Sequence, residues 1–176
     1  MLIRLAHDDD AETLAQAEYD TSASQEGLLA AKPHEIPVDA FRSKIKHLRV
    51  HGLYIVMETQ GQLVGHLILE PLGLSAISHV SQLTVVVHPG HTGNGFGKAL
   101  LKYAIHWART SAAVEKIELR VRSTNVRAIG LYESLGFVRE GVLKRRIKMQ
   151  QGYADDICMA LFVDGPSHAT WGKMED

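Results

Sequence analysis

The sequence predicts a single mixed α/β domain, in which a mostly antiparallel sheet is flanked by about four helices. The chain of 176 residues is too short for two ordinary domains but long enough to bury a substantial core. Its 45% hydrophobic and 22% charged residues are typical of globular proteins. Segments with the alternating period of strands are interspersed with segments of helical period, which predicts both kinds of element.

The N-terminal part of the chain predicts one short strand followed by two helices. Residues 1–6 form the strand, and the acids at 8–10 can cap the first helix and stabilise its positive end. Residues 21–35 mix Ser, Gly and Pro with apolar side chains, which indicates a loop or a broken helix. Pro37 suits the first position of the second helix, whose apolar face continues through His47.

Three adjacent antiparallel strands are predicted next. The runs at 53–59 and 63–70 flank a polar break that turns near Gly61. A third run extends from about Ser78 to His88. Pairing of consecutive strands is the simplest topology for such a series.

The rest of the chain predicts a helix, a strand, a second helix and two last strands. A glycine-rich turn at 92–97 opens the first helix, and IELRVR at 117–122 is a strand. The second helix lies within 125–137, and the apolar run at 157–163 is the last strand. The tail from 165 to 176 has little periodicity.

Charge and cysteine content disfavour several functions. The chain has 19 Lys and Arg and 20 Asp and Glu residues, a balance that disfavours non-specific nucleic-acid binding. Cys158 is the only cysteine, so neither an intrachain disulfide nor a multi-cysteine zinc site can form. His88 and His91 bracket a Pro-Gly turn without an acid at ligand spacing, so no metal site is expected. No apolar run reaches the ~20 residues of a membrane helix, and acids replace the apolar segment of a signal peptide, so a cytoplasmic protein is expected.

The turn at 92–97 is the most specific chemical feature. Glycines permit unusual φ angles and close approach, and the following helix offers unpaired N–H groups and a partial positive charge. Such a turn suits a phosphate, although glycines can also serve only to turn the chain. Lys98 precedes Ala99 rather than a magnesium-binding hydroxyl, which is wrong for a Walker-type loop. No early βαβ unit supports a dinucleotide-binding fold.

The segment VVVHPGHTGNGFGKALL resembles the strand, turn and helix that bind acyl-coenzyme A in the GNAT N-acetyltransferases, whose pattern is Q/R-x-x-G-x-G/A. Gly95 and Gly97 match its small positions, and Thr92 stands in the Q/R position. NVRAIGLYESLGF resembles the family's second signature, and GYADDICMAL resembles the final hairpin of a bacterial subgroup. The resemblance covers about Ile3 to Val163 and implies a GNAT-like domain at 1–164, with the sheet splayed between its fourth and fifth strands.

The resemblance also implies where acetyl-CoA binds. Its pyrophosphate would lie on the backbone N–H groups of the glycine turn, and its pantetheine arm would run beside the fourth strand like an added strand. The two strands are expected to separate near Val87 and Val121. Asn125 would cap the following helix or contact the pantetheine. The expected coenzyme-binding residues are Val85, Val86, Val87, Thr92, Gly93, Asn94, Gly95, Phe96, Gly97, Lys98, Asn125 and Ala128.

Tyr132 matches the family tyrosine whose hydroxyl protonates the departing thiolate. A free phenol has a pKa of about 10, above the value of about 8.5 for a thiol, but a hydrogen bond to the developing sulfur anion still stabilises it. The competing interpretation is a half-buried ring packed at helical spacing on Ile129 and Leu135. The spacing alone favours packing, whereas the motif favours the catalytic role.

No general base is assigned, because water can take the proton of an ammonium acceptor. The candidates are Glu118, His79, Gln82 and Glu70. Glu118 shares a strand face with Arg120 and Arg122, which favours an exposed, salt-bridged glutamate.

The acceptor site is expected between residues 21–35 and the turn near Gln150 to Tyr153. The basic run at 144–148 should pair with Asp155 and Asp156 across the last hairpin, or send one charged group into the acceptor pocket. The expected activity is direct transfer of acetyl from acetyl-CoA to a primary amine of a small molecule, amino acid or peptide N-terminus. The alternative is a non-catalytic acyl-CoA-binding or sensing domain, which would not need a tyrosine at this place. A homodimer is favoured over a monomer.

Overall fold

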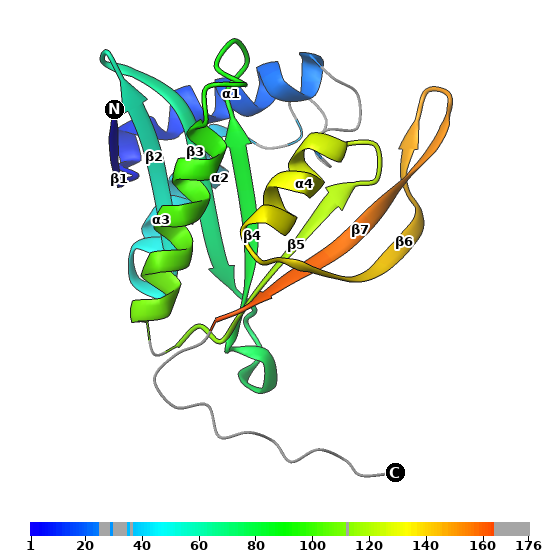
Figure 1. The fold of residues 1–176 in the computed structure, drawn as a ribbon. Helices are drawn as coiled ribbons and strands as arrows, with labels where there is room; N and C mark the ends of the chain where they lie inside the picture. The colour runs from blue at the N-terminus through cyan, green and yellow to red at the C-terminus, as the bar shows by residue number, and fades with distance from the viewer. Residues whose placement is uncertain (25–28, 30–34, 36, 112, 164–176) are drawn as a thin grey trace.

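The computed structural model describes residues 1–24, 29, 35, 37–111 and 113–163. The strands are β1 (Leu2–Leu5), β2 (Leu53–Thr59), β3 (Gln62–Pro71), β4 (Val80–Val87), β5 (Lys116–Arg122), β6 (Val138–Met149) and β7 (Gly152–Phe162). The helices are α1 (Ala11–Ser24), α2 (Val38–His51), α3 (Phe96–Thr110) and α4 (Val126–Ser134), with short 3-10 turns at Asp8–Asp10 and Ser75–Ile77. The strands form one sheet of order β1-β2-β3-β4-β5-β7-β6 (Figure 1). This architecture confirms the predicted mixed α/β class.

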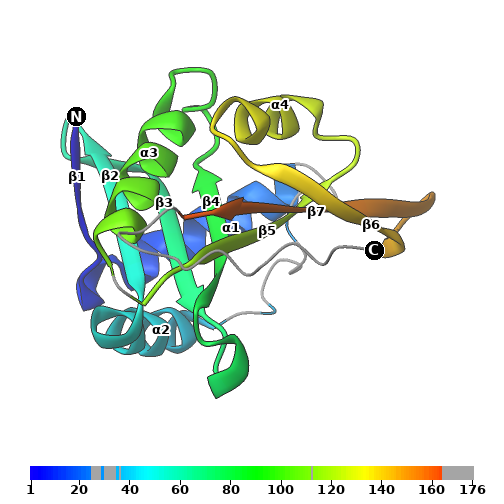
Figure 2. The ribbon, with the colours of Figure 1, turned by 60° about the horizontal axis from the view of Figure 1, so that its bottom comes forward.

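Different helices cover the two faces of the sheet (Figure 2). On one face, α1 and α2 bury a cluster that includes Leu14, Ile45 and Tyr54. On the other face, α3 and α4 pack on strand residues such as Leu67 and Leu119. Because neighbouring residues of a strand point to opposite faces, each inner strand contributes side chains to both clusters. None of the helices described here is long and apolar enough to span a bilayer.

The helical stripe predicted after the glycine turn is confirmed in α3. The buried side chains of this helix are Leu100, Leu101, Ala104, Ile105 and Ala108. They recur three or four positions apart, so they form one face of the helix against the sheet. Full burial of a leucine-sized side chain stabilises the fold by about 1.5–3 kcal/mol, which makes this face a major part of the core.

Several predicted helix limits were wrong by a few residues. Pro37 is the N-cap of α2 rather than its first residue, because its ψ of 156° is extended. The same helix continues past His47 to His51, and Gly52 ends it with an N–H donated to the carbonyl of Leu48 at 3.1 Å. The loop expected from residue 21 begins later, since α1 continues to Ser24. The tail from 165 onward lies outside the described residues.

The predicted antiparallel strands pair as β2-β3-β4. Gln60 and Gly61 join β2 to β3, and both have positive φ angles, 50° and 75°. This is the backbone of a type I′ turn, whose twist matches that of a two-stranded hairpin. The tight turn near Gly61 is therefore confirmed.

The sheet opens between β4 and β5, which form the one parallel pair among the described strands. The two strands are paired at three positions, from Val80 opposite Lys116 to Gln82 opposite Glu118. Beyond these positions β4 stays paired with β3, and β5 stays paired with β7. The edges of β4 and β5 therefore diverge near Val87 and Val121, which confirms the predicted separation (Figure 1).

Candidate active site

A cavity of about 770 Å³ fills the opening between β4 and β5. Its wall is built from β4, the glycine turn, the start of α3, β5 and α4, with contributions from α1, β6 and β7. All the coenzyme-binding residues predicted above lie in this wall except Asn94. The Asn94 amide instead donates to the carbonyl of His91 at 3.1 Å and holds the turn together. The fold thus brings two distant sequence motifs to one site.

The glycine turn closes one end of the cavity. Gly95 is the N-cap of α3 and has a φ of 78°, in the left-handed region that side-chain-bearing residues avoid. The first N–H groups of α3 have no partner within the helix and carry its partial positive charge. Lys98 and Arg127 add side-chain charge to the same wall. This end can therefore bind an anion with several oxygens, such as a phosphate.

Asn125 and Tyr132 lie near opposite ends of α4. The Asn125 side chain accepts a hydrogen bond from the N–H of Ala128 at 3.1 Å, so it caps the helix while also lining the cavity. Tyr132 is 8% exposed, belongs to the core with Ile129, and packs its ring 5.7 Å from that of Phe137. It lines the cavity as well, so packing and access to the site are compatible.

Burial raises the pKa of Tyr132 to about 12. The hydroxyl therefore stays protonated at neutral pH and can serve as a proton donor rather than a base. Its chemistry suits stabilisation of negative charge that develops next to it.

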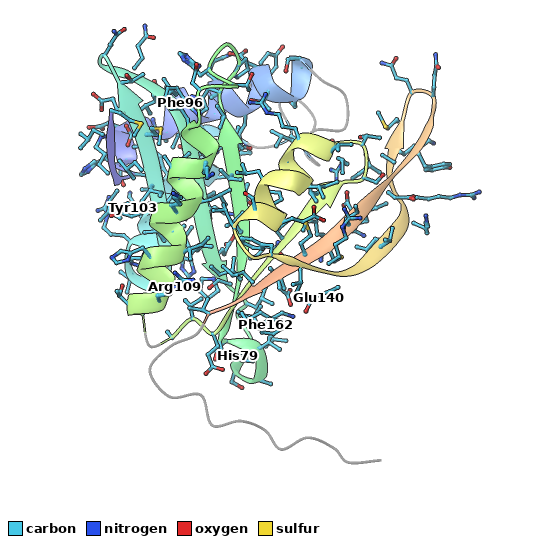
Figure 3. All side chains as sticks on the ribbon, in the orientation of Figure 1. His79, Phe96, Tyr103, Arg109, Glu140 and Phe162 are labelled. Atoms are coloured by element: carbon cyan, nitrogen blue, oxygen red, sulfur yellow. The ribbon has the colours of Figure 1, made fainter. Side chains whose placement is uncertain are left out.

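The four candidates for a general base are poorly placed. Glu118 pairs with Lys116 at 2.8 Å, Glu70 pairs with Lys44 at 2.9 Å, and neither lines the cavity. His79 is exposed and lies just before the start of β4, far from Phe96 and the glycine turn (Figure 3). Gln82 does line the cavity, but its amide, which donates to the carbonyl of Glu118 at 3.1 Å, has no basic nitrogen.

Arg122 and Asp156 form a buried ion pair in the cavity wall. The two residues are opposite each other in the β5–β7 ladder, and the exposed fractions of their side chains are 9% and 4%. This corrects one expectation, since Asp156 does not pair with the basic run. Glu118 is salt-bridged as expected, but to Lys116. The prediction for Asp155 is confirmed, because its carboxylate binds Lys144 at 2.9 Å and the N–H of Arg145 at 2.8 Å.

The acceptor walls are only partly where the sequence places them. Thr21 and Leu29 line the cavity, whereas the turn from Gln150 to Tyr153 does not. That turn lies at the tip of the β6–β7 hairpin, which projects from the body of the molecule (Figure 1). Arg146 and Ile147, nearer the base of the hairpin, contribute instead. Of the basic run, Arg146 therefore lines the cavity.

A buried polar chain beneath α1 was not anticipated. His66 on β3 lies 3.1 Å from His88 and 3.2 Å from the carboxylate of Glu18, ring nitrogen to polar atom in each case. The second ring nitrogen of His88 bonds the carbonyl of Leu63 at 2.9 Å. In the sequence, the sign of these buried polar contacts was the histidine within the apolar run LVGHLILE. The described residues contain no group of three or more side chains suited to hold a metal ion.

Folding is expected to become less favourable as the pH falls from about 6.5 to about 4. Burial first, and then the neighbouring His66, lower the pKa of His88 to about 4 from an ordinary value of 6.5. The hydrogen bond with Leu63 opposes this shift, and the effects of His91 (lowering) and Glu18 (raising) are smaller. Between these values the unfolded chain binds a proton that the folded chain does not, so the free energy of unfolding decreases by roughly 1–3 kcal/mol. Urea titrations at several pH values measure this decrease.

The matched variants are His88→Gln, which removes the titrating group, and His106→Gln, which changes an exposed histidine on α3. His88→Gln should flatten the pH dependence, and His106→Gln should retain it. An equal slope in wild type and His88→Gln contradicts the assignment.

The comparisons with known proteins agree with this geometry. A sequence model described as "Acetyltransferase (GNAT) family" matches residues 11–137. Spermidine N(1)-acetyltransferase of Vibrio cholerae is 30% identical over 109 residues, 62% of each chain, so the match spans less than two thirds of that relative. N-alpha-acetyltransferase RimI of Mycobacterium tuberculosis is 30% identical over 132 residues, 75% of this chain and 80% of the relative. The structure of yncA, a putative acetyltransferase from Salmonella typhimurium with its cofactor acetyl-CoA, has a TM-score of 0.86 at 21% identity and covers 98% of this chain and 99% of its own.

Proposed function

The chain belongs to the GNAT acetyltransferase family, and from this premise we propose that it transfers an acetyl group from acetyl-CoA directly to a primary amine. The acceptor is a small molecule, an amino acid or a peptide N-terminus. The observation that carries the proposal is the cavity between β4 and β5, which has the glycine turn at one end and Tyr132 in its wall. We also propose that the protein is located in the cytoplasm, where acetyl-CoA is available, and that it forms a homodimer.

The residues of the cavity fit acetyl-CoA. The unpaired N–H groups at the start of α3, with Lys98 and Arg127, suit its pyrophosphate and phosphate. The open edge of β4 from Val85 to Val87 can pair with the amide groups of pantetheine, as an added strand would. When bound, acetyl-CoA supplies the activated thioester carbonyl.

Tyr132 supplies the acid in the proposed mechanism. As the amine nitrogen bonds to the carbonyl carbon and the carbon–sulfur bond breaks, the phenol donates its proton to the leaving sulfur. A pKa of about 12 keeps the hydroxyl protonated, so it can donate a hydrogen bond that stabilises the negative charge developing on sulfur before the proton is transferred. The tyrosine is then restored by water.

The amine must lose its own proton before it attacks. Among the described residues of the wall, Asp156 is the only carboxylate and no imidazole is present. Asp156 is held by Arg122, so we propose that water accepts the amine proton. The enzyme therefore acts on the fraction of acceptor that is already uncharged.

Addition of acetyl-CoA is expected to raise the melting temperature by about 5–10 °C. A ligand that binds only the native state stabilises it by ~2.7 kcal/mol at a hundredfold excess over Kd, and this converts at the usual entropy of a domain of this size. Differential scanning calorimetry with and without millimolar acetyl-CoA measures the shift. If the melting temperature of a folded sample does not change, the proposed coenzyme site is wrong.

A thiol-release assay with a panel of primary amines tests the transfer itself. Thiol release that requires both acetyl-CoA and an amine supports the enzyme. A melting shift with no thiol release for any amine would instead favour an acyl-CoA-binding or sensing domain.

A further inference from the structure

The cavity has two sides, which the alternation of strand residues defines. Leu83 and Val85 of β4 pack toward α3 and α4, so the coenzyme side of the cavity lies there. Val86 is opposite His66 in the β3–β4 ladder and faces α1 with it. Thr84 shares this face because it is two residues from Val86. We call this second side, where Thr21 of α1 also lines the cavity, the acceptor side.

Charged residues of β5, β6 and β7 line the cavity. Leu119 and Val121 of β5 point into the core, so Arg120 and Arg122 point to the acceptor side. Arg146 and Asp156 line the same cavity. Asp156 is neutralised by Arg122 in the buried pair.

Of the other positive charges in the wall, Lys98 and Arg127 lie toward the glycine-turn end, and Arg120 and Arg146 lie on β5 and β6. Arg120 and Arg146 are exposed in the cavity wall, and within the described parts of the chain neither has a carboxylate within salt-bridge distance. A guanidinium presents paired N–H donors that match a carboxylate or phosphonate and cannot accept a hydrogen bond from an ammonium group. The part of the cavity beside β5 and β6 therefore suits an anion.

We infer that the acceptor is a small primary amine that carries its own anionic group, as a free amino acid does, and that Arg120 and Arg146 bind this group. The inference rests on the proposed acetyl transfer and narrows its substrate class. A polyamine, which brings further positive charge, is disfavoured by the same two arginines. This holds although one relative is a spermidine N(1)-acetyltransferase.

The two arginines also help to explain how an amine could react although no general base is free among the described residues of the wall. A positive charge close to an amine disfavours its protonated form and so lowers the pKa of that amine. The arginines would thus hold the anionic end of the acceptor and increase the uncharged fraction of its amine. Binding and activation use the same side chains.

The binding test is isothermal titration of the protein, free and saturated with CoA, with the L-amino acids, their carboxamides and spermidine. At least one amino acid should bind about tenfold or more tightly than its own carboxamide, and spermidine should bind more weakly than that amino acid. The matched amides change only the charge. Equal binding of acid and amide throughout the panel, tightest binding of spermidine, or no binding of any amino acid overturns the inference.

The variants Arg120→Gln and Arg146→Gln place the effect. Each should reduce the preference for carboxylate over carboxamide by about tenfold and leave CoA affinity unchanged. Arg139→Gln is the matched control, because Arg139 lies on β6 outside the cavity wall, where it pairs with Glu133. Loss of CoA affinity in Arg120→Gln or Arg146→Gln would show that these arginines serve the coenzyme, and would overturn the inference.

Two further experiments identify the kind of anion that binds and test the acetyl transfer separately from acceptor binding. L-Alanine against 1-aminoethylphosphonate distinguishes a carboxylate-binding from a phosphonate-binding site, and preference for either over L-alanine amide supports the inference. Thiol release is followed with the same compounds. If an amino acid binds more tightly than its amide but no compound releases thiol, the acetyl transfer is refuted and the anion-binding inference stands. If amides and acids release thiol equally well, the acetyl transfer stands and the anion-binding inference is refuted.

Discussion

Replacement of Tyr132 by Phe is expected to lower kcat by about 10²–10⁴, the usual contribution of one acid–base group. The ring packs against Phe137 in the core, and the substitution keeps that packing while it removes only the hydroxyl. CoA affinity and the melting temperature should therefore stay close to those of the wild type. Thiol-release kinetics, with calorimetry to verify folding, measure both quantities.

Tyr103→Phe is the matched control for this experiment. Tyr103 is 40% exposed on the outer surface of α3, away from the cavity (Figure 3). Its loss of a hydroxyl should leave kcat unchanged. A change confined to KM in Tyr132→Phe would place the hydroxyl in substrate binding, and an unchanged rate would leave Tyr132 with packing alone.

Gly95→Val is expected to weaken CoA binding by about 100-fold or more and so to abolish the melting shift. A side chain at φ 78° strains the backbone by about 1–3 kcal/mol and would occupy the space through which a phosphate approaches the N–H groups of α3. Nothing lies within 4 Å of a Cβ built on Gly95, so the effect does not come from a clash with the protein. Titration calorimetry with CoA measures the loss.

Gly90→Val separates strain from ligand access. Gly90 has a φ of 82°, its added Cβ also meets nothing within 4 Å, and it does not line the cavity. This variant should lose about as much basal stability as Gly95→Val and yet keep CoA affinity. Equal loss of CoA affinity in both variants would mean that backbone strain alone, and not a phosphate site at Gly95, explains the result.

The sequence was informative wherever one local pattern decided the structure. The apolar stripe that includes Leu100 and Ala104 has only one way to face a core, and Gly61 between two β-rich runs specifies a tight hairpin. The glycine turn and Tyr132 were found because each lies in a contiguous motif. Their presence in one cavity followed from the family resemblance, since no local pattern relates Gly95 to Tyr132.

The features that were missed depend on contacts between distant segments. The alternation of β5 shows that Glu118 and Arg122 share a face, but not that β7 places Asp156 beside only the second of them. His66 and His88 meet because β3 and β4 pair in one particular register. Glu18 contacts His66 from α1, which is far from both histidines in the sequence. Register and helix docking are set by the whole core, so the sequence alone could not show that these three side chains meet.

The narrow junction between β4 and β5 has a consequence for cooperativity. Three ladder positions are the hydrogen-bonded link between a half-sheet of β1 to β4 and a half-sheet of β5 to β7. Local opening costs least where few backbone bonds must break, so this seam is where we expect the sheet to open first, although one core cluster packs across it. A ligand that lies along β4 and touches β5 adds a cross-link to the seam, and it would slow hydrogen exchange of the strand amides on both sides of the opening.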